Sequence, residues 1–548
     1  MKQYNLPRVA YFCMEFGLHE DFKIYSGGLG ILAGDILKAA QDGNYPMVGV
    51  GILWRQGYTT QVVQNDGKLY DCFPEYRYDF LEDTGVTVEV WIRSRPVRLK
   101  VWKTTQFGNV PLYLLDANLP ENGDRLITGQ LYGWFNEERI AQEMVLGIGG
   151  VRALRALGIP VDVFHFNDSH PVVAGLELIR EKIKWDGLCF DEAWARTKEQ
   201  IVFTTHTPIL AGNEVHEHRI LQYMSTYNNL SYEQMVRLGG DPFGMTIAGL
   251  RLARKANAVA ELHGETARNM WRHVDNAAKI IAITNGVHNG TWQDQRVSLA
   301  CSMGTDLWPP HIAAKREMIA EIEARNGVKL NEAVLTIGFA RRAAPYKRSD
   351  LIFRKREIIE PLLKEGKLQL VFSGKAHPND LDGKGIINKL YEMSKLYPES
   401  VVFLQNYDMK IGKLLTRGCD VWLNNPIRPM EASGTSGMKA AMNGVLNLSI
   451  LDGWWPEGCN HGVTGWQISD TCPTHDQDCT DSDALYHVLL NEVIPTYYEN
   501  HHKWLEMMKA SIQMSEWKFS AARMVREYYE RMYLKPGEVI IKDQEMVG

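Results

Sequence analysis

The sequence predicts a mixed α/β protein built on doubly wound, largely parallel sheets, and two observations support this fold class. Short, continuous apolar runs rich in β-branched residues recur along the chain, as expected for parallel strands buried on both faces. Helical patterns lie between these runs, for example over residues 136–157, where an apolar stripe ends at Gly158. The predicted strands are 161–166, 201–205, 280–284, 334–340, 368–372, 401–404, 421–423 and 445–450.

Polar residues follow each predicted strand. Asp168 and His170 come after the first strand, His206 after the second, and Arg341 and Arg342 after the fourth. In doubly wound sheets, ligands bind beyond the carboxyl ends of the strands. The start of a loop explains one or two such clusters, whereas their recurrence indicates a ligand site along this edge.

A break in composition at residues 292–310, which contains Trp308-Pro309-Pro310, divides the chain. We expect two Rossmann-like lobes that face each other across a cleft, over residues 1–295 and 296–515. A C-terminal helical segment, 516–548, is expected to cross back to the first lobe.

The composition excludes several classes of protein. The 548 residues are 45% hydrophobic and 23% charged, as in ordinary globular proteins. A net charge of −6 without a long basic run argues against nucleic-acid binding. There is no apolar stretch long enough for a membrane span, and the run from Val9 to Met14 is too short for a secretory signal, so we expect a cytoplasmic protein. The 8 irregularly spaced cysteines are expected to be reduced core thiols.

A glycine-rich motif, Ser26–Asp35 (SGGLGILAGD), precedes a helical stretch. Glycines at a helix start let backbone amides approach an anion. Gly28–Ala33 also matches the G-x-G-x-x-A dinucleotide fingerprint, but residues 46–54 supply no carboxylate for a ribose, which argues against NAD. The motif is therefore an anion loop or a tight turn.

Four cations follow the strand at 334–340: Arg341, Arg342, Lys347 and Arg348. They repel one another unless solvent or an anion intervenes. At a strand's carboxyl end, a bound phosphate is favoured over a solvated charge run.

The segment 431–444 (EASGTSGMKAAMNG) opens a helix and contains a lone lysine, Lys439. We expect the positive end of the helix dipole to lower the pKa of its amine, which suits Schiff-base formation. The glycine-rich turn offers amides to the phosphate of an attached cofactor. The alternative is a surface helix start with an incidental lysine.

A polar loop near the C-terminus contains Cys459, His461, Cys472, His475 and Cys479. Its spacing lacks paired C-x₂-C knuckles, so we predict no metal site there.

Together these motifs resemble, in the same order, those of the glycogen and α-glucan phosphorylases. The segment 431–444 is similar to the family's pyridoxal-phosphate lysine motif. Further matches are the glycine motif, residues 12–16, NDSHP at 167–171, TNG at 284–286 and residues 346–348. The resemblance runs from about residue 8 to residue 455. It implies a two-lobed GT-B glycosyltransferase fold.

The resemblance also implies an activity. This is the reversible phosphorolysis of α-1,4-glucans or maltooligosaccharides by inorganic phosphate to glucose 1-phosphate, with retention at the anomeric carbon. The cofactor would be pyridoxal 5′-phosphate, whose phosphate acts as the general acid/base. Aromatic residues are plentiful and suit sugar rings as well as cores.

The resemblance assigns roles to individual residues. Lys439 would hold the cofactor as a Schiff base, and its phosphate would be bound by Thr435, Ser436, Gly437, Arg341 and Gly27. The substrate phosphate would be bound by Gly28, Arg342 and Lys347. The glucosyl unit would be bound by Leu29, His206, Asn285, Glu431, Ser433 and Gly434. Asp168 and His170 would lie on the acceptor side, and the catalytic set would be Lys439, Arg342, Lys347 and His206.

The sequence also departs from the family pattern. Arg341 stands where longer members have lysine, Ala344-Pro345 replaces more polar residues, and Ser436-Gly437 replaces Gly-Asn. The regulatory segment of the animal enzymes is expected to be missing, and with it control by phosphorylation or AMP. A homodimer is a family expectation.

Two alternatives differ in class. A nucleotide-sugar glucan synthase would share the two-lobed fold but would need no cofactor lysine. A non-catalytic glucan-binding protein would have no need to keep Arg342, Lys347 and Lys439 together.

Overall fold

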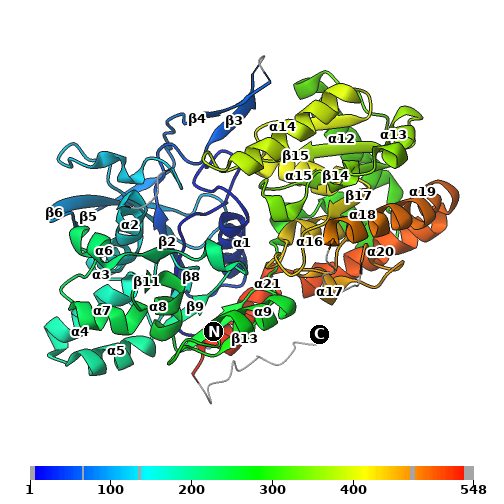
Figure 1. The fold of residues 1–548 in the computed structure, drawn as a ribbon. Helices are drawn as coiled ribbons and strands as arrows, with labels where there is room; N and C mark the ends of the chain where they lie inside the picture. The colour runs from blue at the N-terminus through cyan, green and yellow to red at the C-terminus, as the bar shows by residue number, and fades with distance from the viewer. Residues whose placement is uncertain (1–5, 65–66, 134–136, 470–475, 536–548) are drawn as a thin grey trace.

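The computed structural model describes residues 6–64, 67–133, 137–469 and 476–535, and it contains two large β-sheets covered by helices (Figure 1). The mixed α/β class with large parallel sheets, predicted from the sequence, is confirmed.

The first sheet has nine strands in the order β13-β12-β9-β8-β1-β2-β7-β6-β5. The six strands from β13 to β2, together with β7, are parallel, whereas β5 and β6 form an antiparallel edge. The bounds are β1 (Val9–Phe12), β2 (Met47–Ile52), β5 (Glu82–Ile92), β6 (Arg95–Thr104), β7 (Leu112–Asp116), β8 (Val163–Asn167), β9 (Ile201–Thr204), β12 (Lys255–Ala258) and β13 (Ile280–Ala282).

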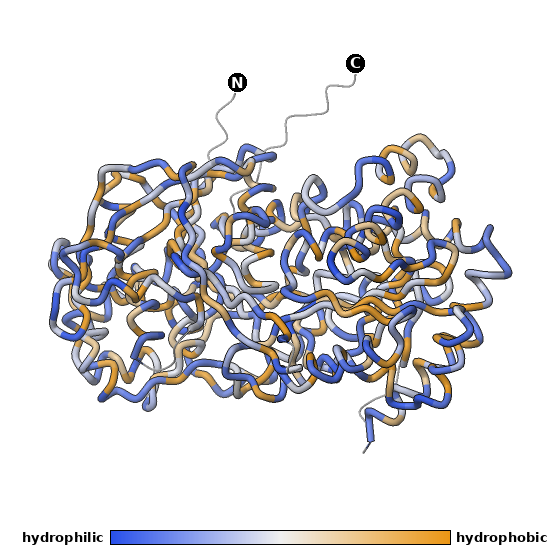
Figure 2. The backbone as a smooth tube through the Cα atoms, turned by 90° about the horizontal axis from the view of Figure 1, so that it is seen from above, coloured by the Kyte–Doolittle hydropathy of each residue, from blue (hydrophilic) through white to orange (hydrophobic). Residues whose placement is uncertain are grey.

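The second sheet has six parallel strands in the order β16-β15-β14-β17-β18-β19. Figure 2 shows its strands as a run of hydrophobic backbone, which is typical of parallel strands covered on both faces. The bounds are β14 (Thr336–Ala340), β15 (Gln369–Ser373), β16 (Val401–Leu404), β17 (Val421–Asn424), β18 (Leu446–Ser449) and β19 (Gly465–Gln467). Two antiparallel pairs lie outside the large sheets: β3 (Thr60–Val63) with β4 (Leu69–Cys72), and β10 (Val215–His216) with β11 (Phe243–Gly244).

Helices surround both sheets. Those of the first half are α1 (Gly28–Asp42), α2 (Glu137–Met144), α3 (Gly150–Ala156), α4 (Ala174–Asp186), α5 (Phe190–Lys198), α6 (His218–Tyr223), α7 (Tyr232–Gly239), α8 (Met245–Leu252), α9 (Glu261–Trp271), α10 (Asn289–Trp292) and α11 (Gln295–Met303). Those of the second half are α12 (Trp308–Asn326), α13 (Arg356–Lys364), α14 (Leu381–Leu396), α15 (Met409–Gly418), α16 (Thr435–Ala441), α17 (Trp455–Gly458), α18 (Gln477–Val488), α19 (Ile494–Glu499), α20 (His501–Lys518) and α21 (Ala521–Glu527).

All eight strands predicted from apolar runs are present, with ends shifted by a few residues. The helix predicted over 136–157 is confirmed as α2 and α3, joined by a π-helical turn at Val145–Gly149. A Cβ at Gly147, in this turn, would lie 2.6 Å from the Ala174 backbone nitrogen. Glycine there allows this turn to approach α4 closely.

The chain returns to the first sheet near its end. The largest core cluster contains residues up to Ile283 and then residues 521–533 of the C-terminal helices. Helix α21 packs against α1, while α20 belongs to the core of the second sheet. The passage between the two cores therefore lies at residues 519–520.

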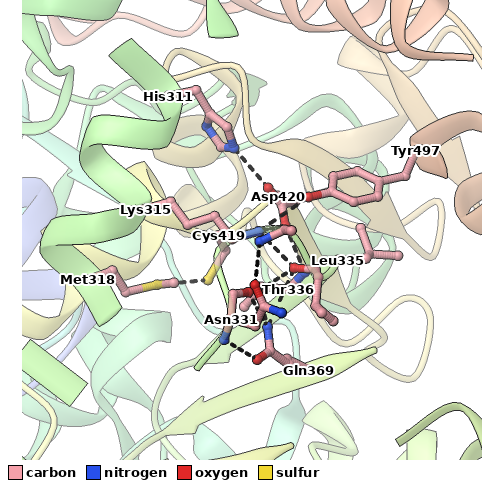
Figure 3. A network of polar contacts seen from close by, with 12 residues as sticks. His311, Lys315, Met318, Asn331, Leu335, Thr336, Gln369, Cys419, Asp420 and Tyr497 are labelled. Carbon is pink, nitrogen blue, oxygen red and sulfur yellow. Dashed lines mark hydrogen bonds and ion pairs between the residues drawn. The ribbon is translucent and has the colours of Figure 1, made fainter. Parts of the chain in front are cut away.

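A buried polar network fixes the second sheet at the end opposite its carboxyl edge (Figure 3). Asp420, just before β17, accepts hydrogen bonds from Lys315 Nζ at 2.5 Å, His311 Nε2 at 2.9 Å and the Thr336 amide at 2.7 Å. Lys315 and Asp420 are fully buried. Because the charges are paired and the donors point at one carboxylate, the network ties α12 to the sheet rather than forming a ligand site.

The expectation of core thiols is wrong for two cysteines. Cys13 and Cys419 are buried, but Cys72 on β4 and Cys189 before α5 are exposed. The seven cysteines in the described ranges are all free thiols. Within the same ranges, no helix combines the length and apolar character needed to cross a membrane.

Candidate active site

The cations after β14 meet a buried carboxylate. Arg341 Nη2 lies 2.6 Å from Glu431 Oε2, and Lys347 Nζ lies 3.3 Å from the same oxygen. Burial alone would raise the pKa of Glu431, but the charges of Arg341 and Lys347 outweigh it and lower that pKa. The Arg341 Nε is buried without a partner, so a donor remains for an anion.

Arg348 does not belong to this site, contrary to the sequence interpretation of four clustered cations. Its backbone is left-handed, at φ 49°, and its guanidinium turns toward α18. It donates to the Asn425 and Pro426 carbonyls at 2.9 Å and to Asp481 at 2.6 Å. These contacts satisfy the charge of Arg348, so its side chain holds the loop after β14 against the segment after β17 and against α18. Arg342, in contrast, is exposed beside Tyr346.

Lys439 is buried in α16, and its ammonium lies 3.6 Å from the centroid of the Trp292 ring. The Trp292 indole donates to both oxygens of Asp35, at 3.0 and 2.9 Å. Burial lowers the pKa of Lys439 to about 8, and the nearby Asp35 charge opposes the shift.

The predicted direction of this shift is confirmed, but the predicted cause is wrong. Lys439 is in the last turn of a seven-residue helix, where the dipole favours a cation. Desolvation, which disfavours the charged amine, lowers the pKa instead.

The turn that opens α16 is built from small residues. Gly434 has φ 86°, in the left-handed region, and the buried Ser433 hydroxyl has no partner. A Cβ at Gly437 would lie 2.6 Å from Asn447 Oδ1, and the Gly437 amide donates to the Gly434 carbonyl at 3.2 Å. Ser436 Oγ accepts from the Trp422 indole at 3.2 Å, while Thr435 is half-buried. Close packing against Asn447 thus requires glycine at position 437.

The glycine loop before α1 is held by Glu15, a residue that sequence reasoning did not single out. Its carboxylate accepts from the amides of Ser26 at 2.5 Å and Gly27 at 3.1 Å, and from the Tyr132 hydroxyl at 2.9 Å. A Cβ added at Gly27 or Gly28 would meet nothing within 4 Å, so the loop borders open space. The matched segment 12–16 contained the only sequence signal for Glu15.

The loop before α1 lies against the second sheet's side of the molecule. The Tyr25 hydroxyl accepts from the Met409 amide at 3.1 Å, and Lys23 pairs with Asp408 at 3.4 Å. Farther along, His377 Nε2 donates to the Tyr132 carbonyl at 2.9 Å. Leu29, at the start of α1, packs against the first core. The glycine loop is therefore adjacent to segments that follow β15 and β16.

A further cation, Lys375, follows β15, and the sequence interpretation gave it no role. Burial lowers the pKa of Lys375 to about 8, while the Asp408 charge opposes the shift. The next residue, Ala376, exchanges two hydrogen bonds with the Gln61 side chain through its backbone, at 2.7 and 2.9 Å. Lys375 therefore lies where the two halves of the chain meet.

His206 and Asn285 lie at the carboxyl edge of the first sheet. His206 Nε2 is 2.6 Å from Asn167 Oδ1, and burial lowers the pKa of His206 to about 3. Because an amide oxygen only accepts, Nε2 carries the proton and Nδ1 is an acceptor. The Asn285 Oδ1 is buried without a partner, and its carbonyl is held by Arg523 of α21 at 3.0 Å.

Asp168 and His170 gather with a different set of groups. Asp168 has φ 70°, and burial raises the pKa of its carboxyl to about 7. His170 Nε2 lies 3.9 Å from Glu214 Oε1, and burial lowers the pKa of His170 to about 4. These two residues thus adjoin Glu214, and the centroid of the His170 ring also lies 5.7 Å from that of Tyr132, the partner of Glu15.

The cysteine and histidine loop near the C-terminus does not assemble a ligand set in the part that can be described. Cys472 and His475 lie outside the described residues. His461 pairs with Glu492 at 2.8 Å, and burial raises the pKa of Cys459 to about 12. Over the described ranges, the metal-ligand grouping found is Glu143, Glu214 and His216.

The fold and site define a mixed α/β protein that gathers anion-binding donors and a buried amine of lowered pKa. The sequence model of the family described as carbohydrate phosphorylase matches residues 307–457. The maltodextrin phosphorylase of Thermococcus litoralis is 39% identical in sequence, and the alignment covers 97% of this chain and 71% of that protein. The glycogen phosphorylase of Aquifex aeolicus is 36% identical, over 97% of this chain and 87% of the relative. An uncharacterised protein of Methanocaldococcus jannaschii is 36% identical, over 96% of this chain and 99% of that protein.

The chain belongs to the carbohydrate phosphorylase family, as its motifs indicated. It is an enzyme of the glycosyltransferase class.

Proposed function

We propose that this chain is a pyridoxal-phosphate-dependent α-glucan phosphorylase that converts α-1,4-glucan and inorganic phosphate to glucose 1-phosphate with retention. The observation that carries the proposal is Lys439, a buried amine of lowered pKa in the motif similar to the family's cofactor motif. The names of two relatives, maltodextrin and glycogen phosphorylase, support the substrate class. A nucleotide-sugar synthase would not require this amine.

In this proposal the two sheets form two lobes of a GT-B fold, over residues 1–295 and 296–515. The segment predicted over 516–548 returns to the first lobe within its described residues, which end at Lys535. Two separate cores support the division, and the packing of α21 on α1 supports the return. The catalytic cleft lies where the carboxyl edges of both sheets meet.

The residues present fit a cofactor that carries an aldehyde and a phosphate. With a pKa of about 8, a fraction of the Lys439 amine is neutral near neutral pH and can act as a nucleophile. Open space at Gly27 and the unpartnered Arg341 Nε and Ser433 hydroxyl offer room and hydrogen-bonding groups. Lys439 would attach the cofactor, and Thr435, Ser436, Gly437, Arg341 and Gly27 would hold its phosphate. When bound, the cofactor supplies a phosphate group as acid and base.

The protein's own residues bind and orient the substrates. Gly28, Arg342 and Lys347 receive inorganic phosphate, which competes with Glu431 for the charge of Lys347. The released Glu431 carboxylate then accepts a sugar hydroxyl. Dense donors stabilise the negative charge that develops near the scissile bond.

The glucosyl unit lies between the lobes. Ser433 and Gly434 contact it from the second lobe, and Leu29, His206 and Asn285 contact it from the first. Neutral His206 offers Nδ1 as an acceptor for a hydroxyl, because its Nε2 proton is used by Asn167. Asp168 and His170 orient the acceptor glucan.

The test measures glucose 1-phosphate released from a maltooligosaccharide ladder with and without inorganic phosphate, and a parallel reaction offers nucleotide-sugar donors. We expect release that depends on phosphate and no transfer from a nucleotide sugar. Transfer from the nucleotide sugar alone would identify a synthase. Glucan binding without either reaction, in protein that carries the cofactor, would identify a non-catalytic binding protein.

A further inference from the structure

A second group of titratable side chains lies beside the acceptor-side residues. It consists of Glu143 on α2, and Glu214 and His216 at β10. One ligand atom from each of these residues lies within 4.8 Å of the other two. The residues come from segments about 70 positions apart in the sequence, and the fold alone brings them together.

The carboxyl groups of Glu143 and Glu214 share a hydrogen bond, but the His216 ring nitrogen that faces them is not part of it. His216 Nε2 lies 3.2 Å from Glu143 Oε2 and 3.8 Å from Glu214 Oε2. That nitrogen is nevertheless buried without a hydrogen-bond partner, as are Glu214 Oε2 and Glu143 Oε1. Glu143 is 1% exposed and His216 is 9% exposed. A buried ring nitrogen directed at two carboxylates without a hydrogen bond is costly unless a ligand satisfies it.

The charges around the group leave it negative when both carboxyls are ionised. Arg139, one turn before Glu143, lies 3.6 Å from Glu214, but on the Oε1 side, away from His216. His170 also faces Oε1, at 3.9 Å. One arginine cannot neutralise two carboxylates, of which Glu143 is buried and Glu214 half-buried, so a divalent cation would relieve their repulsion.

We propose that Glu143, Glu214 and His216 form a binding site for a first-row divalent cation, for which zinc is the best-matched ion. One imidazole and two carboxylates suit zinc, and three protein ligands leave a fourth position for water. Arg139 then holds the second oxygen of Glu214 as an outer-shell partner. The ion ties α2 to β10, at the far end of the loop that begins at His206. This site does not depend on the proposed activity.

The competing explanation is a proton shared by Glu143 and Glu214, which would remove one charge without a metal. The two explanations differ in whether zinc binds, and in the effect of replacing Glu143 by an uncharged isostere.

The experiment uses the full chain, stripped with a chelator, exchanged into buffer at neutral pH and titrated with zinc alone, with magnesium as the comparison ion. We expect one zinc per chain after gel filtration and a higher melting temperature with zinc than with magnesium. Glu143→Gln and His216→Ala should each lose the ion or bind it at least about tenfold more weakly.

The matched control is His502→Ala, which breaks an exposed pair in which His502 Nδ1 lies 3.6 Å from Glu506. This variant should keep the zinc and its stabilising effect. Circular dichroism of each metal-free variant establishes that it is folded, and His216→Gln replaces His216→Ala if the latter is not.

The proposal is overturned if the wild type retains no stoichiometric zinc, or if both ligand variants retain it. If zinc does not bind and Glu143→Gln raises the melting temperature at neutral pH, the result also identifies the competing explanation, a proton shared by Glu143 and Glu214. Metal content and melting temperature are measured without turnover. Failure of the zinc proposal therefore leaves the proposed activity untouched, and failure of the proposed activity leaves the zinc proposal untouched.

Discussion

The ammonium of Lys439 lies 3.6 Å from the centroid of the Trp292 ring, and the Trp292 indole donates to Asp35. The three residues come from α16, α10 and α1, so the amine is held where elements of both halves of the chain meet. Burial of the amine, moderated by Asp35 and the ring face, sets its reactivity.

Asp35→Asn should lower the pKa of Lys439 further, because Asp35 is the charge that favours the ammonium. Asparagine keeps an acceptor for the Trp292 indole, so the geometry should survive. The pH dependence of cofactor uptake by the cofactor-free protein measures this, and its midpoint should move to lower pH. Asp42→Asn, on the same helix but exposed, is the control and should leave the midpoint unchanged.

Arg342→Met should impair the use of phosphate far more than the binding of glucan. Arg342 is exposed, so its loss should change the free energy of unfolding by less than about 0.5 kcal/mol. Removing one preorganised donor should lower kcat/KM for phosphate by about 100-fold or more. Steady-state kinetics and glucan affinity electrophoresis separate the two effects. Equal losses in both would indicate a structural role for Arg342.

Glu431→Gln should destabilise the protein by about 3 kcal/mol, because it leaves Arg341 and Lys347 with an uncompensated charge. Urea unfolding measures this loss. Inorganic phosphate should restore more stability in the variant than in the wild type, since the anion takes the place of the carboxylate. Glu332→Gln breaks an exposed pair and should cost less than about 1 kcal/mol.

The same variant predicts a pH dependence. The pKa of Glu431 is lowered in the folded protein, so its contribution is present above the ordinary carboxyl pKa and is lost as pH falls through the folded value. The difference in unfolding free energy between wild type and Glu431→Gln should therefore be constant near neutral pH and shrink in acid. A difference that grows in acid would contradict the pairing.

Gly453→Ala should disrupt the turn that opens α16, because Gly453 packs against Ser433 of that turn. The residue has φ 58°, and an added Cβ would lie 2.2 Å from the Ser433 carbonyl oxygen, which cannot move without shifting the turn. Gly366→Ala is the control, because it has φ 64° but open space around the Cβ and costs only the left-handed strain of about 1–2 kcal/mol. Melting temperatures compare them. Equal shifts would mean that the contact with Ser433 adds nothing.

Eight parallel strands could be predicted from the sequence because each lies in a continuous apolar run. The parallel strands β1, β2, β7, β12 and β19 were not predicted, and β12 and β19 each contain polar residues. The antiparallel edge was missed because β5 is not a continuous apolar run: its buried residues Val88, Val90 and Ile92 alternate with exposed ones. The π-helical turn inside the predicted helix depends on the close approach of Gly147 to α4, a tertiary contact that no local pattern reveals.

For the site, the sequence identified the segments but not their electrostatics. It assigned the lowered pKa of Lys439 to a helix dipole, because burial cannot be deduced from a motif. It grouped Arg348 with the phosphate-binding cations, although that side chain turns to Asp481, more than 100 residues later. It gave no role to Glu15, whose partner Tyr132 comes 117 residues later in the sequence.

We propose that Lys439 anchors the cofactor of a glucan phosphorylase. Borohydride reduction of the cofactor-loaded enzyme, followed by peptide mapping, tests it most directly, with Lys439→Ala and the exposed Lys389→Ala as paired variants. We expect the label on Lys439 alone, with cofactor and phosphate-dependent turnover lost in Lys439→Ala and kept in Lys389→Ala. Label on another lysine, or full turnover by Lys439→Ala, would contradict the account.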